Sequence, residues 1–93
     1  MTVGLMVVTL FAGHCHSLKD KRQTLSSLKE RLKQKFNVAV AESDFQDLWQ
    51  KIQLGIVSVS NSRTVLDKLF RQIEEFICSE YPLQITEIRV QYL

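Results

Sequence analysis

The chain has few of the residues that mark a special class of protein. Among its 93 residues there are two cysteines, one proline, three glycines and one tryptophan. Cys15 and Cys78 lie far apart and do not make the disulfide framework of a small secreted domain, so we expect reduced thiols and a cytoplasmic protein. The scarcity of proline and glycine excludes low-complexity linkers. A formal net charge of only +2 excludes polycationic nucleic-acid binding as a property of the whole chain.

The apolar segment 3–12 precedes small residues and Cys15, as in a signal peptide or a lipoprotein leader. It lacks the basic residues that begin a secretory signal, and His14 stands where a lipoprotein signal has a small residue. The run is also too short to span a bilayer. We therefore expect a buried strand here, with no targeting segment and no membrane partner.

Hydropathy periodicity divides the chain into six elements. Strands are predicted at 3–11, 38–43, 52–60 and 83–93, one helix at 18–36, and a second between a cap at Asn61 or Ser62 and Pro82. The order β-α-β-β-α-β with right-handed crossovers predicts an α+β fold, the ferredoxin-like sandwich, with both helices on one face of a four-stranded antiparallel sheet. We expect residues 1–93 to form a single ferredoxin-like domain, because no repeat or linker divides them.

Local signals refine these elements. Ser17-Leu18-Lys19-Asp20 has the S-x-x-D form of a capping box at a helix start. The first helix then carries an apolar stripe and the second helix an apolar inner face. The stripe consists of Leu18, Leu25, Leu28, Leu32 and Phe36, and the inner face of Val65, Leu69, Ile73, Phe76 and Ile77. In the last strand the apolar alternation changes parity after Ile85, which predicts a β-bulge near Thr86-Glu87.

Two helices on one face leave the other face of the sheet uncovered. In the first strand both alternating sets are apolar, Met6, Val8 and Leu10 against Val3, Leu5 and Val7. A contiguous apolar surface on a small protein usually marks an interaction site. We predict a homo-oligomer that forms through the uncovered sheet face or through a strand edge. The alternative is a monomer in which long side chains of the edge strands shield the face.

The strongest local feature is the charge of the first helix. Segment 17–36 holds seven basic and two acidic residues, a net charge of +5, which leaves −3 for the rest of the chain. Clustered lysine and arginine can follow phosphates, since the release of condensed counterions favours binding. We predict nucleic-acid contacts, with RNA or the ribosome as partner, through Lys19, Lys21, Arg22, Lys29 and Lys33. The alternative is a solvated face that only keeps the protein soluble.

The turn before this helix supports a second hypothesis. His16, Ser17, Lys19 and Arg22 gather near a helix N-terminus, where amide groups and the helix dipole favour anions. A phosphate or carboxylate ligand could bind there; the alternative is that Ser17 only caps the helix and His16 only packs. The His14-Cys15-His16 run has too few ligands for zinc, so we expect no metal and no cofactor.

The segment between the second and third strands holds the single tryptophan. Trp49 is either a packing anchor or a stacking surface. Asp44 and Asp47 have no histidine near them in sequence, so acid–base chemistry would need His16 from elsewhere in the fold. Cys78 falls on the polar side of the second helix, where we expect it to be exposed.

Three segments resemble a known family: 16–22 (HSLKDKR), 36–42 (FNVAVAE) and 46–50 (QDLWQ). Over essentially its whole length the chain is similar to the YlxP-like family of small bacterial proteins, a domain of unknown function. The resemblance implies a ferredoxin-like fold and a cytoplasmic bacterial protein. It also implies a role near RNA or ribosomes, because relatives are often encoded beside transcription and translation factors, and it implies no catalytic residues. Gly13-His14-Cys15 departs from the Pro- and acid-containing loop expected there.

The sequence therefore predicts a non-enzymatic, RNA- or ribosome-associated module that acts through a basic first helix. The alternative is an oligomeric regulatory domain that binds a small anion or metabolite at the turn before that helix. An enzyme that uses Asp44 or Asp47 with His16 is the least favoured hypothesis.

Overall fold

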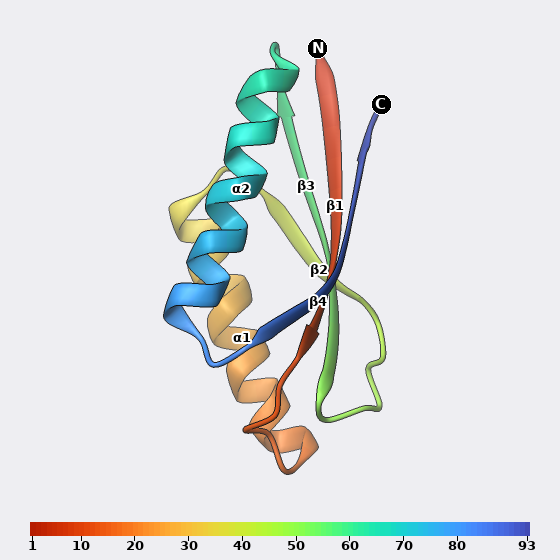
Figure 1. The fold of residues 1–93 in the computed structure, drawn as a ribbon, viewed down its shortest axis with the longest axis vertical. Coiled ribbons are helices and arrows are strands. Elements are labelled where there is room, and N and C mark those ends of the chain that lie inside the picture. Colours follow the sequence, from red (N-terminus) through yellow and green to blue (C-terminus); the bar gives the residue numbers. More distant parts are fainter.

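A computed structural model describes residues 1–93 as two layers, a sheet and a pair of helices (Figure 1). The sheet contains β1 (Thr2–Phe11), β2 (Ala39–Asp44), β3 (Lys51–Ser60) and β4 (Gln84–Tyr92), and the helices are α1 (Leu18–Lys35) and α2 (Arg63–Glu80). The order β-α-β-β-α-β confirms the predicted ferredoxin-like fold. Neither helix combines the length and the apolarity that a bilayer crossing requires.

The strands are antiparallel in the order β2-β3-β1-β4, so the two most apolar strands lie in the middle of the sheet. The register of β1 against β4 shifts between Thr9 and Leu10. Thr86, the residue that the pairing skips, donates its hydroxyl to the Thr9 carbonyl at 3.2 Å. The β-bulge predicted near Thr86-Glu87 is confirmed.

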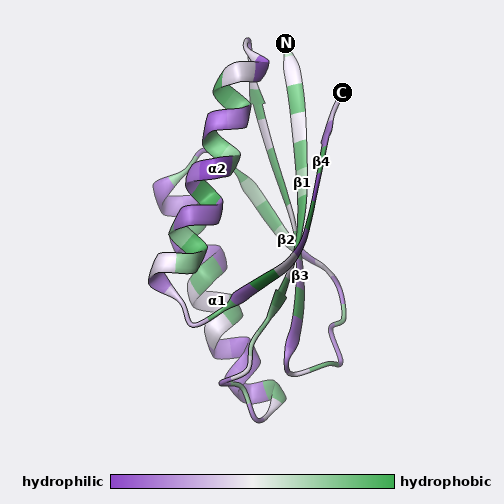
Figure 2. Ribbon diagram, viewed as in Figure 1, coloured by the Kyte–Doolittle hydropathy of each residue, from purple (hydrophilic) through white to green (hydrophobic).

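The core lies between the sheet and the helices. Alternate side chains of the two central strands face the helices and are fully buried, namely Met6, Val8 and Leu10 from β1 and Ile52, Leu54 and Ile56 from β3. The helices contribute Leu25, Leu28 and Leu32 from α1 and Ile73 and Ile77 from α2. Figure 2 shows apolar and hydrophilic residues alternating along both helices. Each helix thus gives one stripe to the core and leaves its other faces to solvent.

The buried face of α2 is rotated from the predicted one. Val65, expected on the inner face, is 55% exposed, whereas Leu66 and Phe70 are buried. The prediction for Val65 was wrong because the stripe that begins one residue later puts a leucine and a phenylalanine against the sheet. Gly4 of β1 makes this packing possible, since a Cβ atom at this position would lie 2.9 Å from Cε2 of Phe70.

The face of the sheet away from the helices carries no other element (Figure 1). Its apolar centre, called the uncovered face below, consists of Val3, Leu5, Val7, Val57 and Val59. All five side chains are partly or largely exposed. At its rim on β4, Arg89 and Glu87 form an ion pair of 3.2 Å. The helices thus cover one apolar set of β1, Met6, Val8 and Leu10, and leave the other set, Val3, Leu5 and Val7, on the uncovered face.

Candidate nucleic-acid interface

Four basic residues of α1 lie along one flank of the helix. They fall within about 80° on a helical wheel and form the cationic stripe: Lys19, Arg22, Lys29 and Lys33. Lys29 is half-buried and the other three are exposed. None of the four takes part in an ion pair within the protein. At 1.5 Å per residue the stripe is about 21 Å long, and its charges are available to an outside polyanion.

Arg31 and Lys35, on the opposite flank of α1, are held against α2. Arg31 forms an ion pair of 3.1 Å with Glu80, and its guanidinium carbon lies 5.0 Å from the centre of the Phe76 ring. Its contact with the Tyr81 hydroxyl and, after that, the charge of Glu80 raise the pKa of Arg31. The Lys35 amino group also lies 5.0 Å from the centre of the Phe76 ring. These two cations join the helices, which leaves the cationic stripe facing away from α2.

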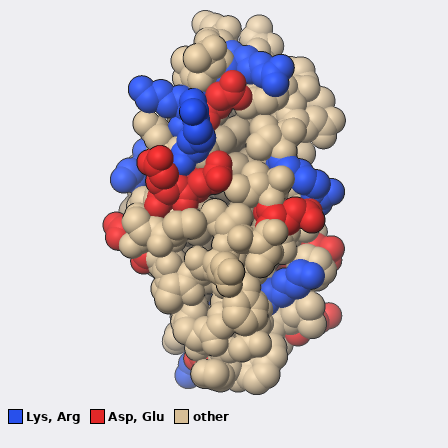
Figure 3. All heavy atoms as spheres, viewed as in Figure 1, with Lys and Arg blue, Asp and Glu red and all other residues tan.

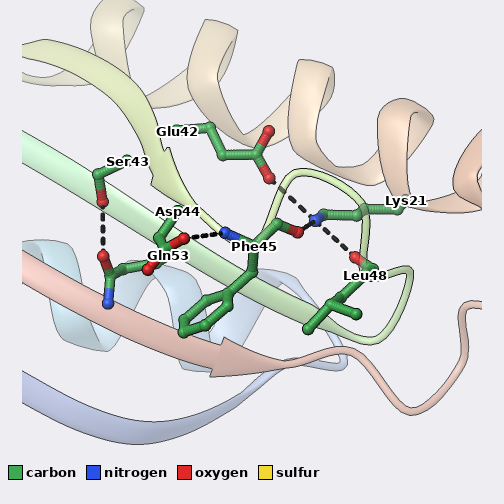
Figure 4. Close-up of polar contacts among 7 residues, drawn as sticks. All are labelled: Lys21, Glu42, Ser43, Asp44, Phe45, Leu48 and Gln53. Carbon is green, nitrogen blue, oxygen red and sulfur yellow. Dashed lines mark hydrogen bonds and ion pairs between the residues drawn. The ribbon is translucent and has the colours of Figure 1, made fainter.

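Lys21 is buried, with only 2% of its surface exposed. Its amino group donates to the carbonyl oxygens of Phe45 and Leu48, both at 2.6 Å, and lies 2.9 Å from a carboxylate oxygen of Glu42 (Figure 4). The ammonium thus donates two hydrogen bonds and forms one ion pair inside the protein. The prediction that Lys21 contacts nucleic acid is wrong, because its charge is already neutralised below the surface. Instead, it ties α1 to β2 and to the loop between β2 and β3.

The sequence contained a signal for this role of Lys21. The residue lies three positions after Leu18 and four before Leu25, which places it inside the apolar stripe and not on its flank. A lysine in such a position needs a buried partner, because an unpaired ammonium is costly to remove from water. Glu42 on the edge strand beneath α1 supplies it.

The turn before α1 closes as a capping box. The Ser17 hydroxyl accepts a hydrogen bond of 3.1 Å from the Asp20 amide, and the Asp20 carboxylate accepts one of 3.0 Å from the His16 amide. The capping box predicted at 17–20 is confirmed in a shifted form, because the Asp20 carboxylate bonds the amide of His16, one residue before the N-cap Ser17. The Asp20 carboxylate also puts a negative charge at the helix N-terminus, where a bound anion would benefit from the dipole. This charge makes an anion site at His16, Ser17, Lys19 and Arg22 less favourable than nucleic-acid contacts along α1.

Cys15 and His14 lie side by side in the turn between β1 and α1. The Cys15 side chain is fully buried, and its sulfur lies 3.6 Å from Nε2 of His14. The same ring nitrogen lies 3.0 Å from the Thr24 hydroxyl of α1. His14 thus covers the thiol and joins the turn to the helix. Cys78 is exposed, as predicted.

Trp49 lies at the surface of the loop between β2 and β3, with 44% of its area exposed. Its ring packs edge-on against the His16 ring, with 6.4 Å between centroids and an interplanar angle of 77°. The Asp44 carboxylate accepts a hydrogen bond of 2.8 Å from the Phe45 amide, and Asp47 is exposed. His16 therefore lies against the tryptophan, and the loop presents an aromatic surface beside the start of α1.

Charges are arranged differently on the side of the molecule that carries α2. Figure 3 shows basic and acidic side chains interspersed over that surface. On α2 itself, Arg71 lies one turn from Glu74 and Glu75. Opposite charges at this spacing attract each other, so Arg71 has two acidic neighbours on its own helix, whereas in the cationic stripe only Lys33 has one, Glu30.

The chain matches a family model described as "Protein of unknown function (DUF503)" over residues 3–90. The chain belongs to the DUF503 family. A relative within it, the uncharacterised protein YlxP of Bacillus subtilis strain 168, is 37% identical over 76 residues, which cover 82% of this chain and 83% of YlxP. The resemblance to the YlxP-like family is thus confirmed.

Among solved structures, a Thermus thermophilus protein described as a putative PII-like signaling protein aligns with 99% of this chain and 90% of its own. The TM-score is 0.43 and the sequence identity 18%. The DUF503 description assigns no activity, so the function has to be inferred from the residues of this chain.

Proposed function

We propose that this DUF503 protein is a non-enzymatic, cytoplasmic binding module that contacts RNA, free or within the ribosome, through the cationic stripe of α1. The observation that supports the proposal is the division of charge on one helix. Four basic residues on one flank have no acidic partner, whereas Lys21, Arg31 and Lys35 are engaged within the protein. Like charges one turn apart repel each other, and a polyanion relieves that repulsion while releasing its own counterions.

The charge outside the stripe gives the interaction a direction. The remainder of the chain has 8 basic and 10 acidic residues, a net charge of −2. A polyanion is therefore attracted to one flank of α1 and repelled, on balance, by the rest of the surface. The module would bind RNA in one orientation, with the flank of α1 that faces away from α2 against the phosphates. Contacts to phosphates position a protein and carry no sequence information by themselves.

The proposal is tested by charge reversal on α1 and on α2. Lys29→Glu with Lys33→Glu removes half of the stripe, and Lys68→Glu with Arg71→Glu makes the same change in net charge on exposed positions of α2. Binding of fluorescently labelled single-stranded RNA is followed by anisotropy at low salt. We expect the α1 pair to weaken binding about tenfold or more, and the α2 pair to weaken it much less. Equal effects of the two pairs, or no binding by the wild type, would refute the proposal.

We also propose that the protein self-associates through the uncovered face. This face is apolar at its centre, and the Glu87–Arg89 ion pair gives its rim both signs of charge, which a second copy related by a twofold axis can match. The test is sedimentation of the wild type, of Val57→Lys on the face and of Val65→Lys on α2 as a control. We expect an oligomer for the wild type and the control and a monomer for Val57→Lys; a monomeric wild type would exclude the proposal.

A further inference from the structure

An exposed apolar hollow lies at the end of the sheet near the start of α1. Its walls include Phe11, Leu48 and Trp49, which are 44%, 47% and 44% exposed, together with Lys51. The hollow has a volume of about 450 Å³ and is open to solvent. Three of the largest exposed apolar side chains of the protein are therefore gathered in one place, around a space large enough for a small planar ligand.

The loop that carries Trp49 is held in place on both sides of the tryptophan. The Leu48 carbonyl accepts from the buried Lys21 ammonium at 2.6 Å, as Figure 4 shows. The Gln50 side chain donates to the Cys15 carbonyl at 3.2 Å, and the backbone carbonyl of Gln50 accepts from the Ala12 amide at 2.8 Å. An aromatic ring on such a loop loses little conformational freedom when a ligand packs on it, so the hollow is preorganised.

The same loop contains the one strained residue of the backbone. Phe45 has a φ of 62°, the left-handed region that non-glycine residues rarely adopt. Its carbonyl is the second acceptor for Lys21, and its ring lies 4.2 Å from the amino group of Lys51. Strain of this kind persists only where the surroundings hold it, and it is typical of ligand-binding loops.

The hollow lies near the start of α1, where the cationic stripe begins. Trp49 packs against His16, three residues before Lys19, the first cation of the stripe. Figure 1 shows the loop between β2 and β3 at the same end of the molecule as the start of α1. Lys51 adds a further positive charge at the wall of the hollow. Aromatic rings beside a line of cations are the combination that binds single-stranded nucleic acid, in which bases stack on rings and phosphates contact cations.

We propose that the hollow binds an unpaired base of single-stranded RNA, stacked on Trp49, while the cationic stripe binds the phosphates next to it. This inference rests on the proposed function and specifies its ligand as single-stranded. A duplex keeps its bases stacked within the helix and cannot offer one to Trp49. Stacking also accepts any base, because every base has a π-face, so the site would select for strandedness and only weakly for sequence.

Trp49 is the single tryptophan of the chain, so its fluorescence reports on the hollow directly. The wild type is titrated with a six-nucleotide oligoadenylate, with an RNA duplex of similar length, and with inorganic polyphosphate, which has charge but no bases. We expect saturable quenching by the oligoadenylate, little quenching by the duplex, and none by polyphosphate even where it competes for the stripe.

Variants of Trp49 separate stacking from charge. Using labelled oligoadenylate, we expect Trp49→Ala to weaken binding about 5- to 150-fold with an unchanged salt dependence, since no phosphate contact is lost. Trp49→Phe keeps a ring and is expected to retain most of the affinity. Circular dichroism establishes that each variant is folded.

The outcomes distinguish this inference from the proposed function. If Trp49→Ala binds oligoadenylate like the wild type while the α1 charge reversals abolish binding, the base site is refuted and the RNA-binding function stands. Equal affinity for duplex and single strand, or loss of self-association in Trp49→Ala without loss of RNA affinity, also refutes the base site. If the wild type binds no RNA at all, both proposals fail.

Discussion

Replacing Lys21 by methionine tests whether its buried ammonium organises the molecule. Methionine has nearly the length of lysine and fits the apolar stripe, but it donates no hydrogen bond. The substitution leaves the Glu42 carboxylate without its cation and the carbonyls of Phe45 and Leu48 without a donor. The Glu42 side chain is 17% exposed, so water can reach it only in part.

The expected loss of stability follows from these contacts. Removing one partner of a buried ion pair costs about 3–5 kcal/mol, because the other charge stays buried. Partial hydration of Glu42 places this site at the lower end, about 3 kcal/mol. For a chain of this size that loss corresponds to a fall in melting temperature of roughly 12–24 °C.

Urea unfolding followed by circular dichroism measures the difference. Lys19→Met, the same substitution at an exposed position of the same helix, is the control and should change the unfolding free energy by less than about 0.5 kcal/mol. Lys21→Met with Glu42→Met removes both charges and should recover part of the loss. If Lys21→Met alone were as stable as the Lys19→Met control, the ion pair would not organise this part of the fold.

Three further substitutions test local features of the fold. Burial and, after it, the hydrogen bond to Asp67 raise the pKa of Tyr92 above its ordinary value of 10.0. As pH rises beyond about 10, the Tyr92 hydroxyl therefore loses its proton in the unfolded chain before it does so in the folded protein, and stability falls. Tyr92→Phe should make this fall smaller in melting curves recorded at alkaline pH. Gly4→Ala places a methyl group 2.9 Å from the Phe70 ring and should lower the free energy of unfolding by about 1–3 kcal/mol. A urea midpoint equal to that of the wild type would contradict this packing. Ser17→Ala removes the helix cap and should cost about 1 kcal/mol, whereas Ser26→Ala at an exposed mid-helix position should cost nothing measurable.

Much of the fold could be predicted because its signals are local. The strand β1 is apolar on both faces, the capping residue Ser17 precedes a clear helical stripe, and the parity change after Ile85 marks the bulge. Each signal depends on neighbours within a few residues, which a sequence displays directly. The one misplaced apolar residue, Val65, lies beside the true stripe of α2, and only packing against the sheet decides between two adjacent stripes.

The candidate site was less predictable because it depends on contacts between distant segments. The place of Lys21 within the apolar stripe indicates burial, but its acceptors at Phe45 and Leu48 come from a loop more than 20 residues away. The division of α1 into a free flank and an engaged flank requires Glu80 and Phe76, which come from α2. Trp49 likewise becomes part of an exposed hollow only when Phe11, the last residue of β1, lies beside its loop.

The salt dependence of RNA binding tests the central claim most directly. If all four cations of the stripe contact phosphates of a single strand, log Kobs should fall with log salt at a slope of about −2.8, a loss of roughly 50-fold between about 50 and 200 mM. Lys29→Gln with Lys33→Gln should halve that slope to about −1.4, whereas Lys68→Gln with Arg71→Gln should leave it unchanged. The same slope for the wild type and for the α1 variant would contradict the account.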